Sequence, residues 1–386
     1  MADGVEDFDL IIDRRAVPGE KWSRYEGRDV IPMWVADMDF AAPEVVLDAI
    51  RRRLDHGVLG YTDAWPSLEQ AVVDAMLRDY GWPIEPGWVV WLPGMVSALN
   101  VACRAIGDDG DGVFTATPIY PPFLRAPANN RRRLQHAALR AGEDGRWRWD
   151  WAATEAAMDA STRLFMLCNP HNPVGRVFDR QELERVAEIC ERRDLVICSD
   201  EIHCGLVLDE DRRHLPIAAL DRSVAARTIT LMAPSKTWNI PSLYCAFAII
   251  PDRDLRRRFR HAMRGIVPHP NLLGLVATEA AYRDGEPWRR RLVRYLRDNR
   301  ERVGLRLAAA AAIQTTLPEA TYLAWLDCRR FASERGIDDL TGHFDSHGVG
   351  ISDGRGFGAP GFVRVNFGCS RQLLEQGLGR MLKALR

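Results

Sequence analysis

Three polar residues that follow apolar runs are the strongest candidates for chemistry in this chain: Asn172, Asp200 and Lys236. Only three of the 52 lysine and arginine residues are lysines, and Lys236 lies between an apolar β-branched run and a turn. A desolvated lysine can lose its proton and form a Schiff base, which an arginine cannot do. A surface lysine at a strand end is the commoner interpretation of a single lysine, so the surrounding residues must decide.

The elements that would position these residues are predicted to be alternating strands and helices from residue 88 onward. Apolar runs predict strands at residues 88–92, 112–117, 162–168 and 194–198, with a further strand beginning at Ile229. This alternation is typical of an α/β fold with a mostly parallel, doubly wound sheet. In such a sheet the carboxyl ends of the strands converge on one crevice. The candidate amide, carboxylate and amine are therefore predicted to lie close together.

An amide, a carboxylate and a lysine at converging strand ends suit one cofactor, pyridoxal 5'-phosphate. Its aldehyde needs a lysine, its ring nitrogen needs a carboxylate that keeps it protonated, and its phenolate oxygen needs a hydrogen-bond donor. Lys236, Asp200 and Asn172 offer these three groups. The turn at Gly94, before a helix predicted at residues 95–106, adds an anion site in outline, because helix N-terminal amides bind phosphate.

Three motifs follow one another in the order and spacing of a known superfamily: Asn172-Pro-Val-Gly175, Asp200-Glu-Ile-His203 and Ser235-Lys-Thr-Trp-Asn239. Through them the chain resembles the fold-type I, class I and II aminotransferase superfamily, whose members use pyridoxal 5'-phosphate. The resemblance implies a large cofactor-binding domain at residues 45–275. It implies a smaller α+β domain built from both chain ends, residues 1–44 and 276–386.

A narrower resemblance extends over nearly the whole chain. Residues 34–40, residues 168–176 and His203, which stands where many aminotransferases carry tyrosine, are similar to the cystathionine β-lyase-like, MalY/PatB-type C–S lyases. The resemblance implies a small amino-acid substrate and a homodimer whose active site lies at the subunit interface. The implied reaction cleaves an S-substituted cysteine, cystathionine-like or bulkier, to a thiol, pyruvate and ammonia.

The same resemblance implies a role for each site residue. Lys236 attaches the cofactor and removes the Cα proton, Asp200 pairs with the ring nitrogen, and Asn172 contacts the ring oxygen with His203 nearby. Arg364 grips the substrate carboxylate in a planar fork, which fixes the Cα–H bond relative to the ring. The other implied residues are Tyr120 stacked on the ring, Tyr61 from the neighbouring subunit, Met95, Val96 and Ser235 at the phosphate, and Ala36 and Asp37 at the substrate.

Several alternatives remain open from the sequence. Transamination shares its proton-abstraction step with β-elimination, so the cofactor motifs do not choose between an aminotransferase and a lyase. A non-catalytic, cofactor-binding regulator is disfavoured, because regulators of this fold usually carry a winged-helix DNA-binding domain ahead of it. Asp37 and Asp39 have an alternative as capping residues of the helix predicted at residues 45–54.

Three residues near the lysine depart from the family pattern: Ala233, Ser242 and Tyr244. Relatives often have a hydroxyl residue at the first position, a glycine at the second and a basic or small residue at the third. The changes are interpreted either as a reshaped phosphate or substrate end of the pocket or as repacking. They raise the prospect of a specialised substrate bulkier than plain cystathionine.

Composition argues against several partner classes. The formal net charge of −1 gives no general field for nucleic acid or for an anionic membrane. No apolar run approaches the ~18 residues of a membrane helix, and the acidic N-terminus lacks the features of a secretory signal. The eight cysteines are scattered without a C-x-x-C pair. This indicates buried free thiols, no metal site and a cytoplasmic location.

Overall fold

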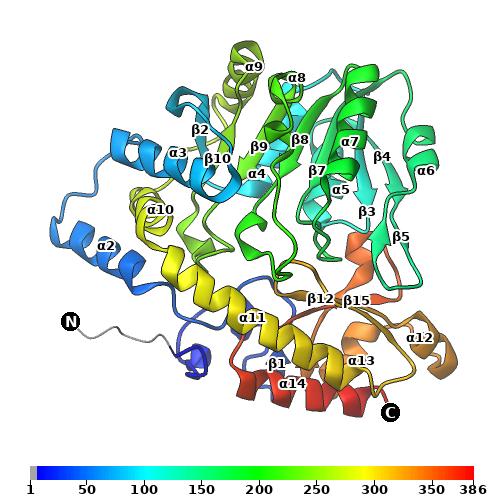
Figure 1. Ribbon diagram of the computed structural model, residues 1–386. Coiled ribbons are helices and arrows are strands. Elements are labelled where there is room, and N and C mark those ends of the chain that lie inside the picture. The colour runs from blue at the N-terminus through cyan, green and yellow to red at the C-terminus, as the bar shows by residue number, and fades with distance from the viewer. Residues whose placement is uncertain (1–6) are drawn as a thin grey trace.

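A seven-stranded sheet forms the centre of the computed structural model, which describes residues 7–386 (Figure 1). In this sheet only β10 runs antiparallel to its neighbours, so the prediction of a mostly parallel α/β sheet is confirmed. The strands, in spatial order, are β2 (Val89–Leu92), β10 (Ala246–Ile249), β9 (Thr228–Met232), β8 (Val196–Asp200), β7 (Thr162–Cys168), β3 (Gly112–Thr117) and β4 (Arg133–Ala138).

The central strands form where the chain is apolar on both faces. β3 and β9 are buried along their whole length, as expected for parallel strands covered on two sides. Successive side chains of β7 alternate between two cores: Leu164 and Met166 pack on one side of the sheet, Phe165 and Leu167 on the other. The polar residues that follow these strands are therefore left at the carboxyl edge.

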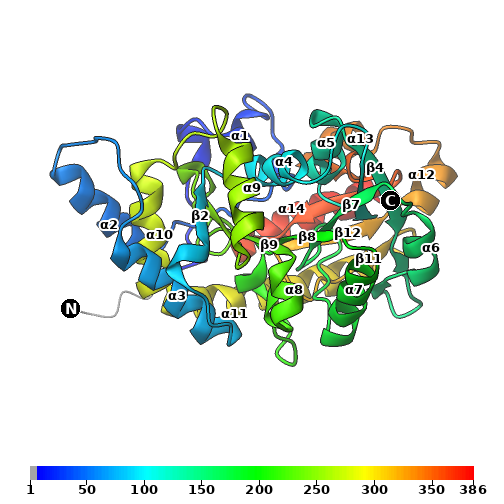
Figure 2. The ribbon, with the colours of Figure 1, turned by 90° about the horizontal axis from the view of Figure 1, so that it is seen from above.

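Helices cover both faces of this sheet, which makes it doubly wound (Figure 2). The capping box that the spacing of Asp179 and Glu182 predicts is present at the start of α7. One face carries α4 (Met95–Ala105), α5 (Pro121–Asn129) and α9 (Arg253–Met263), and the other carries α6 (Trp151–Ala156), α7 (Arg180–Arg192) and α8 (Arg222–Ala226).

A second, antiparallel sheet lies toward the C-terminus, with strand order β11 (Gln314–Thr316), β12 (Leu323–Asp327), β15 (Phe362–Asn366) and β14 (Ser352–Asp353). The chain start joins this region, because β1 (Ile31–Pro32) pairs with β13 (Val349–Gly350). The helices of this part are α11 (Glu286–Leu307), α12 (Arg329–Arg335), α13 (Leu340–Ser346) and α14 (Arg371–Ala384). The strands of both large sheets lie in the parts assigned to them from the sequence, while the exact domain boundaries stay a prediction.

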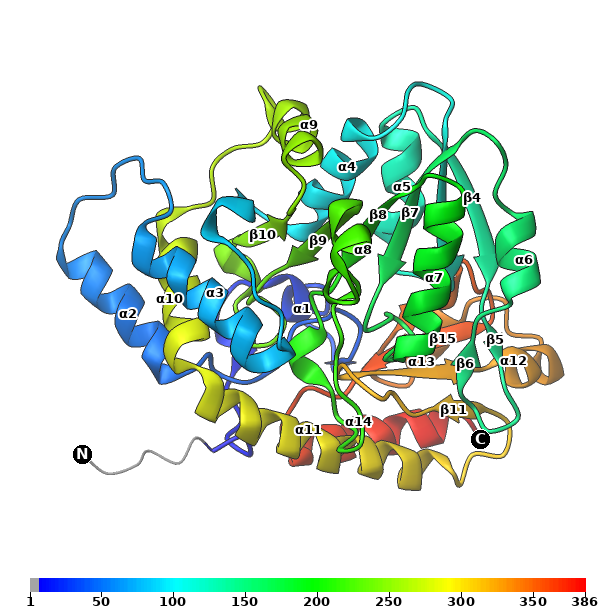
Figure 3. The same cartoon turned by 45° about the horizontal axis from the view of Figure 1, so that its top comes forward.

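The remaining elements link the two sheets or project from them. The segment between α2 and α3 runs outside the main body of the chain (Figure 3). Among residues 7–386, no helix combines the length and the apolar character needed to cross a membrane. These elements are α1 (Glu20–Ser23), α2 (Glu44–Asp55), α3 (Pro66–Tyr80), α10 (Leu272–Asp284) and the hairpin of β5 (Arg140–Ala141) and β6 (Trp147–Arg148).

The structure corrects the capping alternative for Asp37 and Asp39. The residue before α2 is Pro43, and no side chain caps this helix. The two carboxylates instead form ion pairs with Arg14, at 2.9 and 2.7 Å, and the buried Lys21 lies 2.7 Å from Asp39. These ion pairs link the chain start to the segment of residues 34–40. The two acids therefore stabilise tertiary structure rather than a helix end.

Candidate active site

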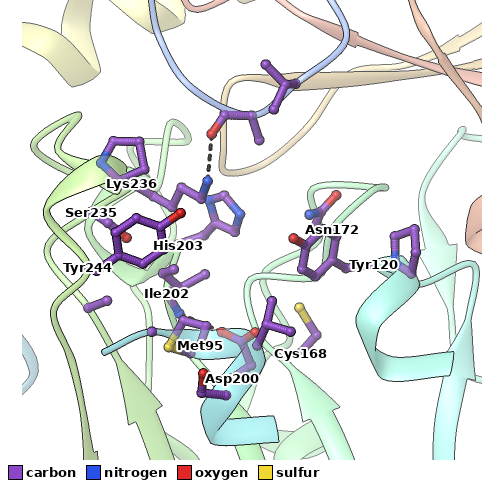
Figure 4. A pocket seen from close by; sticks show the side chains of 18 of the residues that line it. Met95, Tyr120, Cys168, Asn172, Asp200, Ile202, His203, Ser235, Lys236 and Tyr244 are labelled. Carbon is purple, nitrogen blue, oxygen red and sulfur yellow. Dashed lines mark hydrogen bonds between the residues drawn. The ribbon is translucent and has the colours of Figure 1, made fainter. Parts of the chain in front are cut away.

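A cavity of about 510 Å³ lies where the carboxyl edge of the large sheet meets the N-terminus of α4 and the two chain ends. Asn172, Asp200 and Lys236 all line it, so the structure brings together the three residues that the strand pattern places at one edge. Figure 4 shows Ser235 and Tyr244 on one side of the cavity and Asn172 with Tyr120 on the other.

The amine of Lys236 lies in the cavity on the loop after β9. Its Nζ donates a hydrogen bond of 2.6 Å to the carbonyl oxygen of Ala36, drawn as the dashed line in Figure 4. Burial lowers the pKa of Lys236 to about 8, although the carboxylates of Asp37 and Asp200 act in the opposite direction. A sizeable fraction of the amine is therefore neutral near physiological pH, which is the form that can attack an aldehyde.

Asp200, the last residue of β8, is a buried carboxylate that faces the cavity. One oxygen accepts a hydrogen bond of 3.1 Å from the amide of Ile202, and among the described residues no cationic side chain forms an ion pair with it. Burial raises the pKa of Asp200 to about 7, and the charge of Glu201 adds to the rise. This carboxylate is suited to a buried, protonated ring nitrogen, which would compensate its charge.

We expect Asp200→Asn to stabilise the cofactor-free protein at neutral pH. A raised pKa in the folded state means that the stabilising contribution of Asp200 is present below about pH 4 and is lost as pH rises through about 7. The asparagine has no such cost, so the difference in unfolding free energy should grow from near zero at pH 4 to a few kcal/mol at pH 7.5. Denaturant unfolding of both cofactor-free proteins across this range measures it, and a difference independent of pH would contradict the assignment.

Arg364, on β15, lines the cavity and contacts residues of two other segments that line it. Its guanidinium donates to Oδ1 of Asn172 and to the carbonyl oxygen of Trp34, both at 3.0 Å. Burial lowers the pKa of Arg364 only to about 10, so the group stays cationic at neutral pH. A buried cation whose fork faces a cavity is suited to a carboxylate. Nδ2 of Asn172 has no hydrogen-bond partner among residues 7–386 and remains a free donor.

The two ring-bearing residues predicted at the site also line the cavity. Burial lowers the pKa of His203 to about 3, so its imidazole is neutral, and its buried Nδ1 has no hydrogen-bond partner among the described residues. The ring of Tyr120 borders the same cavity, and its backbone amide donates to the carbonyl oxygen of Asn172 at 3.1 Å. Both rings therefore border the cavity, and the imidazole does so in its neutral form.

The N-terminus of α4 opens onto the opposite end of the cavity. The amides of Met95, Val96 and Ser97 precede the first intrahelical hydrogen bond, which runs from Ala98 to Gly94. Together with the hydroxyl of Ser235 they offer donors and a favourable helix dipole to an anion. The large cavity thus has the groups to accept an aldehyde, a basic ring nitrogen and a phosphate.

Two predicted residues lie outside the cavity of their own chain. Tyr61 lies in the segment between α2 and α3, fully exposed and outside the cavity of its own chain. Asp37 also lies outside the cavity, engaged by Arg14 and Lys21. The substrate-binding prediction for this region therefore has geometric support only at Ala36, which lines the cavity.

Sequence reasoning missed the residues that hold the wall formed by residues 34–37. The hydroxyl of Tyr322 donates to the carbonyl oxygen of Ala36 at 2.8 Å, and Ser352 donates to that of Trp34 at 2.6 Å. Nδ2 of Asn366 donates to two further carbonyl oxygens of this segment. Asn366 had a usable signal, since it stands two residues after Arg364 in the same strand. Tyr322 and Ser352 had none, because their partners are more than 280 residues away.

The three atypical residues do not all face the cavity. Ala233 and Tyr244 line it, whereas Ser242 does not. Tyr244 adopts a left-handed backbone with φ of 47° and leaves 65% of its surface exposed. It stands at the end of the cavity near α4, where Figure 4 shows its ring beside Ser235. Of the three departures, Ala233 and Tyr244 are therefore the ones in a position to affect the anion end of the cavity.

The sequence pattern of the family described as aminotransferase class I and II matches residues 28–381. The chain belongs to this family. As a class I and II aminotransferase family member, it is 36% identical to cystathionine beta-lyase PatB of Bacillus subtilis (strain 168), over 98% of this chain and 99% of PatB.

Two solved structures of family relatives have nearly the same fold. The crystal structure of OvoB superposes with a TM-score of 0.94 at 43% identity, covering 98% of this chain and 99% of that one. The PLP-bound C-S lyase from Staphylococcus hominis superposes with a TM-score of 0.92 at 34% identity, covering 98% of each chain. These likenesses extend over the whole chain, so they include both the large sheet and the smaller one that carries Arg364.

Proposed function

We propose that this family member is a pyridoxal 5'-phosphate-dependent C–S β-lyase acting on an S-substituted cysteine. The observation that carries the proposal is the shared cavity of Lys236, Asp200 and the α4 N-terminus, in a chain similar over nearly its whole length to PatB. Lys236 would hold the aldehyde, Asp200 the ring nitrogen, Nδ2 of Asn172 the phenolate oxygen, and the amides at Met95 and Val96 with Ser235 the phosphate. When bound, the cofactor draws electron density away from the substrate Cα.

The side chains supply orientation and proton transfer. Arg364 binds the substrate carboxylate, and Tyr120 covers the ring. The amine of Lys236, displaced by the substrate, accepts the Cα proton as general base. The Cβ–S bond then breaks with its electron pair on sulfur, and the thiolate leaves and takes up a proton. The remaining three-carbon unit takes up one water molecule and yields pyruvate and ammonia.

The lyase proposal is tested by incubating the holoenzyme with S-substituted cysteines in the absence of any keto acid. We expect pyruvate, ammonia and thiol in equal amounts, with many turnovers per active site. Strict dependence on an added keto acid would instead make the protein an aminotransferase, which shares the cavity and the base. Binding of the cofactor without turnover of any amino acid would leave the regulator interpretation.

We further propose a homodimer in which Tyr61 completes the cavity of the neighbouring subunit. Three apolar or aromatic side chains of its segment, Val58, Leu59 and Tyr61, are exposed in the single chain. Exposed apolar groups on a projecting segment are typical of an interface. The phosphate end of the cavity also lacks any lysine or arginine among its described lining residues apart from Lys236. A hydrogen-bond donor from a second subunit would therefore add a contact to the phosphate at this end.

Mixing two defective variants tests this arrangement. Tyr61→Ala and Lys236→Ala should each lose most activity, because one loses a phosphate contact and the other its base. After the two are unfolded together and refolded, roughly a quarter of the sites in a random mixture of dimers carry neither change. Activity should therefore return to about that share of wild type. No recovery above the sum of the separate variants would contradict a shared site.

The cellular setting is also an inference. All eight cysteines are buried and free, which is the usual state of thiols in a reducing compartment. We therefore propose a cytoplasmic enzyme. The small-molecule substrate class follows from the cavity, whose volume of about 510 Å³ lies within the usual range of ligand pockets.

A further inference from the structure

Glu20 is a charged residue of the cavity that the proposed mechanism does not use. It is the first residue of α1, and its side chain lines the cavity at an exposed position. Among residues 7–386, no hydrogen bond or ion pair engages its carboxylate. An acid at a helix start also favours the helix dipole, but α1 has only four residues, so this effect alone gives no reason for the acid to face a cavity.

A short series of contacts places Glu20 at the substrate end of the cavity. The next residue, Lys21, accepts a hydrogen bond of 3.2 Å at its carbonyl oxygen from the indole of Trp34. The carbonyl oxygen of Trp34 in turn accepts from Arg364 at 3.0 Å. Glu20 and the carboxylate-binding Arg364 are thus connected through one tryptophan, whereas the anion end of the cavity is formed by α4 and Ser235.

The other carboxylates near this site are already engaged. Asp37 and Asp39 pair with Arg14 and Lys21, and Asp200 accepts from the amide of Ile202. Glu20 acts on the cavity electrostatically all the same. Burial lowers the pKa of Lys236 to about 8, and Glu20 is one of the acids that oppose this shift. The charge of Glu20 therefore acts on the amine of Lys236, although less strongly than the charges of Asp37 and Asp200.

The surroundings of Glu20 add aromatic surface. Trp34, Tyr120 and Phe357 line the same cavity, and two of these rings already attract cations, since Arg24 lies 4.6 Å over the ring of Trp34 and Arg364 lies 4.8 Å over that of Phe357. Aromatic faces together with a carboxylate form a favourable environment for an organic cation, because the ring quadrupole and the acid charge both attract it. A purely alkyl substituent would gain no charge attraction from this exposed carboxylate, and an anionic substituent would be repelled by it.

We propose that Glu20 selects S-substituted cysteines whose sulfur substituent carries a cationic group, such as an ammonium, at its far end. The inference rests on the proposed lyase function and narrows its substrate class. Arg364 would bind the α-carboxylate of the substrate, while Glu20 binds the cationic group at the far end of the sulfur substituent. The group bound by Glu20 departs with the thiol, so this selection concerns the leaving group and not the reacting carbons.

Two substrates of equal size test the proposal with the holoenzyme. S-(2-aminoethyl)-L-cysteine carries a terminal ammonium, and S-propyl-L-cysteine replaces that ammonium with a methyl group. We expect wild type to prefer the aminoethyl compound in kcat/KM. Glu20→Gln should lower this preference about five-fold, mainly through KM, which is the size of a partly exposed charge pair. Glu20→Lys should reverse it and favour S-(2-carboxyethyl)-L-cysteine.

Glu26→Gln is the matched control, because Glu26 is an exposed acid six residues along that does not line the cavity. Its preference should equal that of wild type. Equal losses for both substrates in Glu20→Gln, or no charge preference in wild type, would overturn the proposal for Glu20. If neither compound releases pyruvate, the lyase function fails, and calorimetric dissociation constants of the same compounds still test Glu20. A five-fold weaker binding of only the cationic compound to Glu20→Gln would support it, and equal binding would refute it.

Discussion

Lys236→Ala should lower the turnover of an S-substituted cysteine by at least about 10³-fold, because a positioned general base contributes up to about 10⁴. The variant should also lose the covalent link to the cofactor. Borohydride reduction followed by mass spectrometry should label Lys236 of wild type and leave the variant unlabelled. Since the buried amine already has its pKa lowered to about 8, an added small amine such as ethylamine should restore part of the activity from solution.

Lys383→Ala is the control for this change. Lys383 is one of the three lysines of the chain and is exposed on α14, away from the cavity. It should keep wild-type turnover and wild-type labelling. A Lys236→Ala protein that keeps its covalent cofactor, or that turns over at the wild-type rate, would remove Lys236 from both roles.

Arg364→Ala should lower kcat/KM by about 10²- to 10³-fold, because the loss of one partner of a buried charge pair costs about 2–5 kcal/mol. Arg364→Lys keeps the charge but not the planar fork, so it should recover only part of this loss. Steady-state kinetics with one S-substituted cysteine measures both changes. The loss should be largest for substrates that carry an α-carboxylate and small for the corresponding amines without it.

The absorbance of the bound cofactor separates this effect from a collapse of the cavity. Arg364 also holds Asn172 and Trp34, so a damaged wall would change the spectrum of the resting enzyme as well. Arg355→Ala provides a matched control, since Arg355 is an exposed arginine paired with Asp353 nearby in the chain. An Arg364→Ala variant with unchanged kcat/KM would place the carboxylate site elsewhere.

The elements of the large sheet were largely predictable, because their signal is local. The apolar runs at residues 112–117 and 162–168 coincide with β3 and β7. A buried parallel strand needs a continuous apolar run, and this requirement is written in the sequence itself. The direction of β10 was not predictable in the same way. An apolar run indicates a strand, but the pairing partner and its direction depend on how distant segments pack.

The candidate site also has residues that local sequence signals predict and residues whose contacts depend on distant segments. Asn172, Asp200 and Lys236 could be named because each follows a strand of one parallel sheet, and topology then brings them together. The partners of Asp37 could not be named. Capping of a nearby helix is a local explanation, whereas its ion pair with Arg14 depends on the fold of the chain start. Glu20 lies on the same chain start and reaches the cavity for the same reason.

By itself the sequence determined the kinds of chemical group available, their order along the strands and hence the type of cofactor that suits them. The tertiary structure alone decided how these groups behave. Burial lowers the pKa of Lys236, raises that of Asp200 and keeps His203 neutral. Contacts from Tyr322 and Ser352 fix the opposite wall. The physical reason is that residue type and periodicity are local properties, whereas desolvation and long-range hydrogen bonds exist only once distant segments have packed.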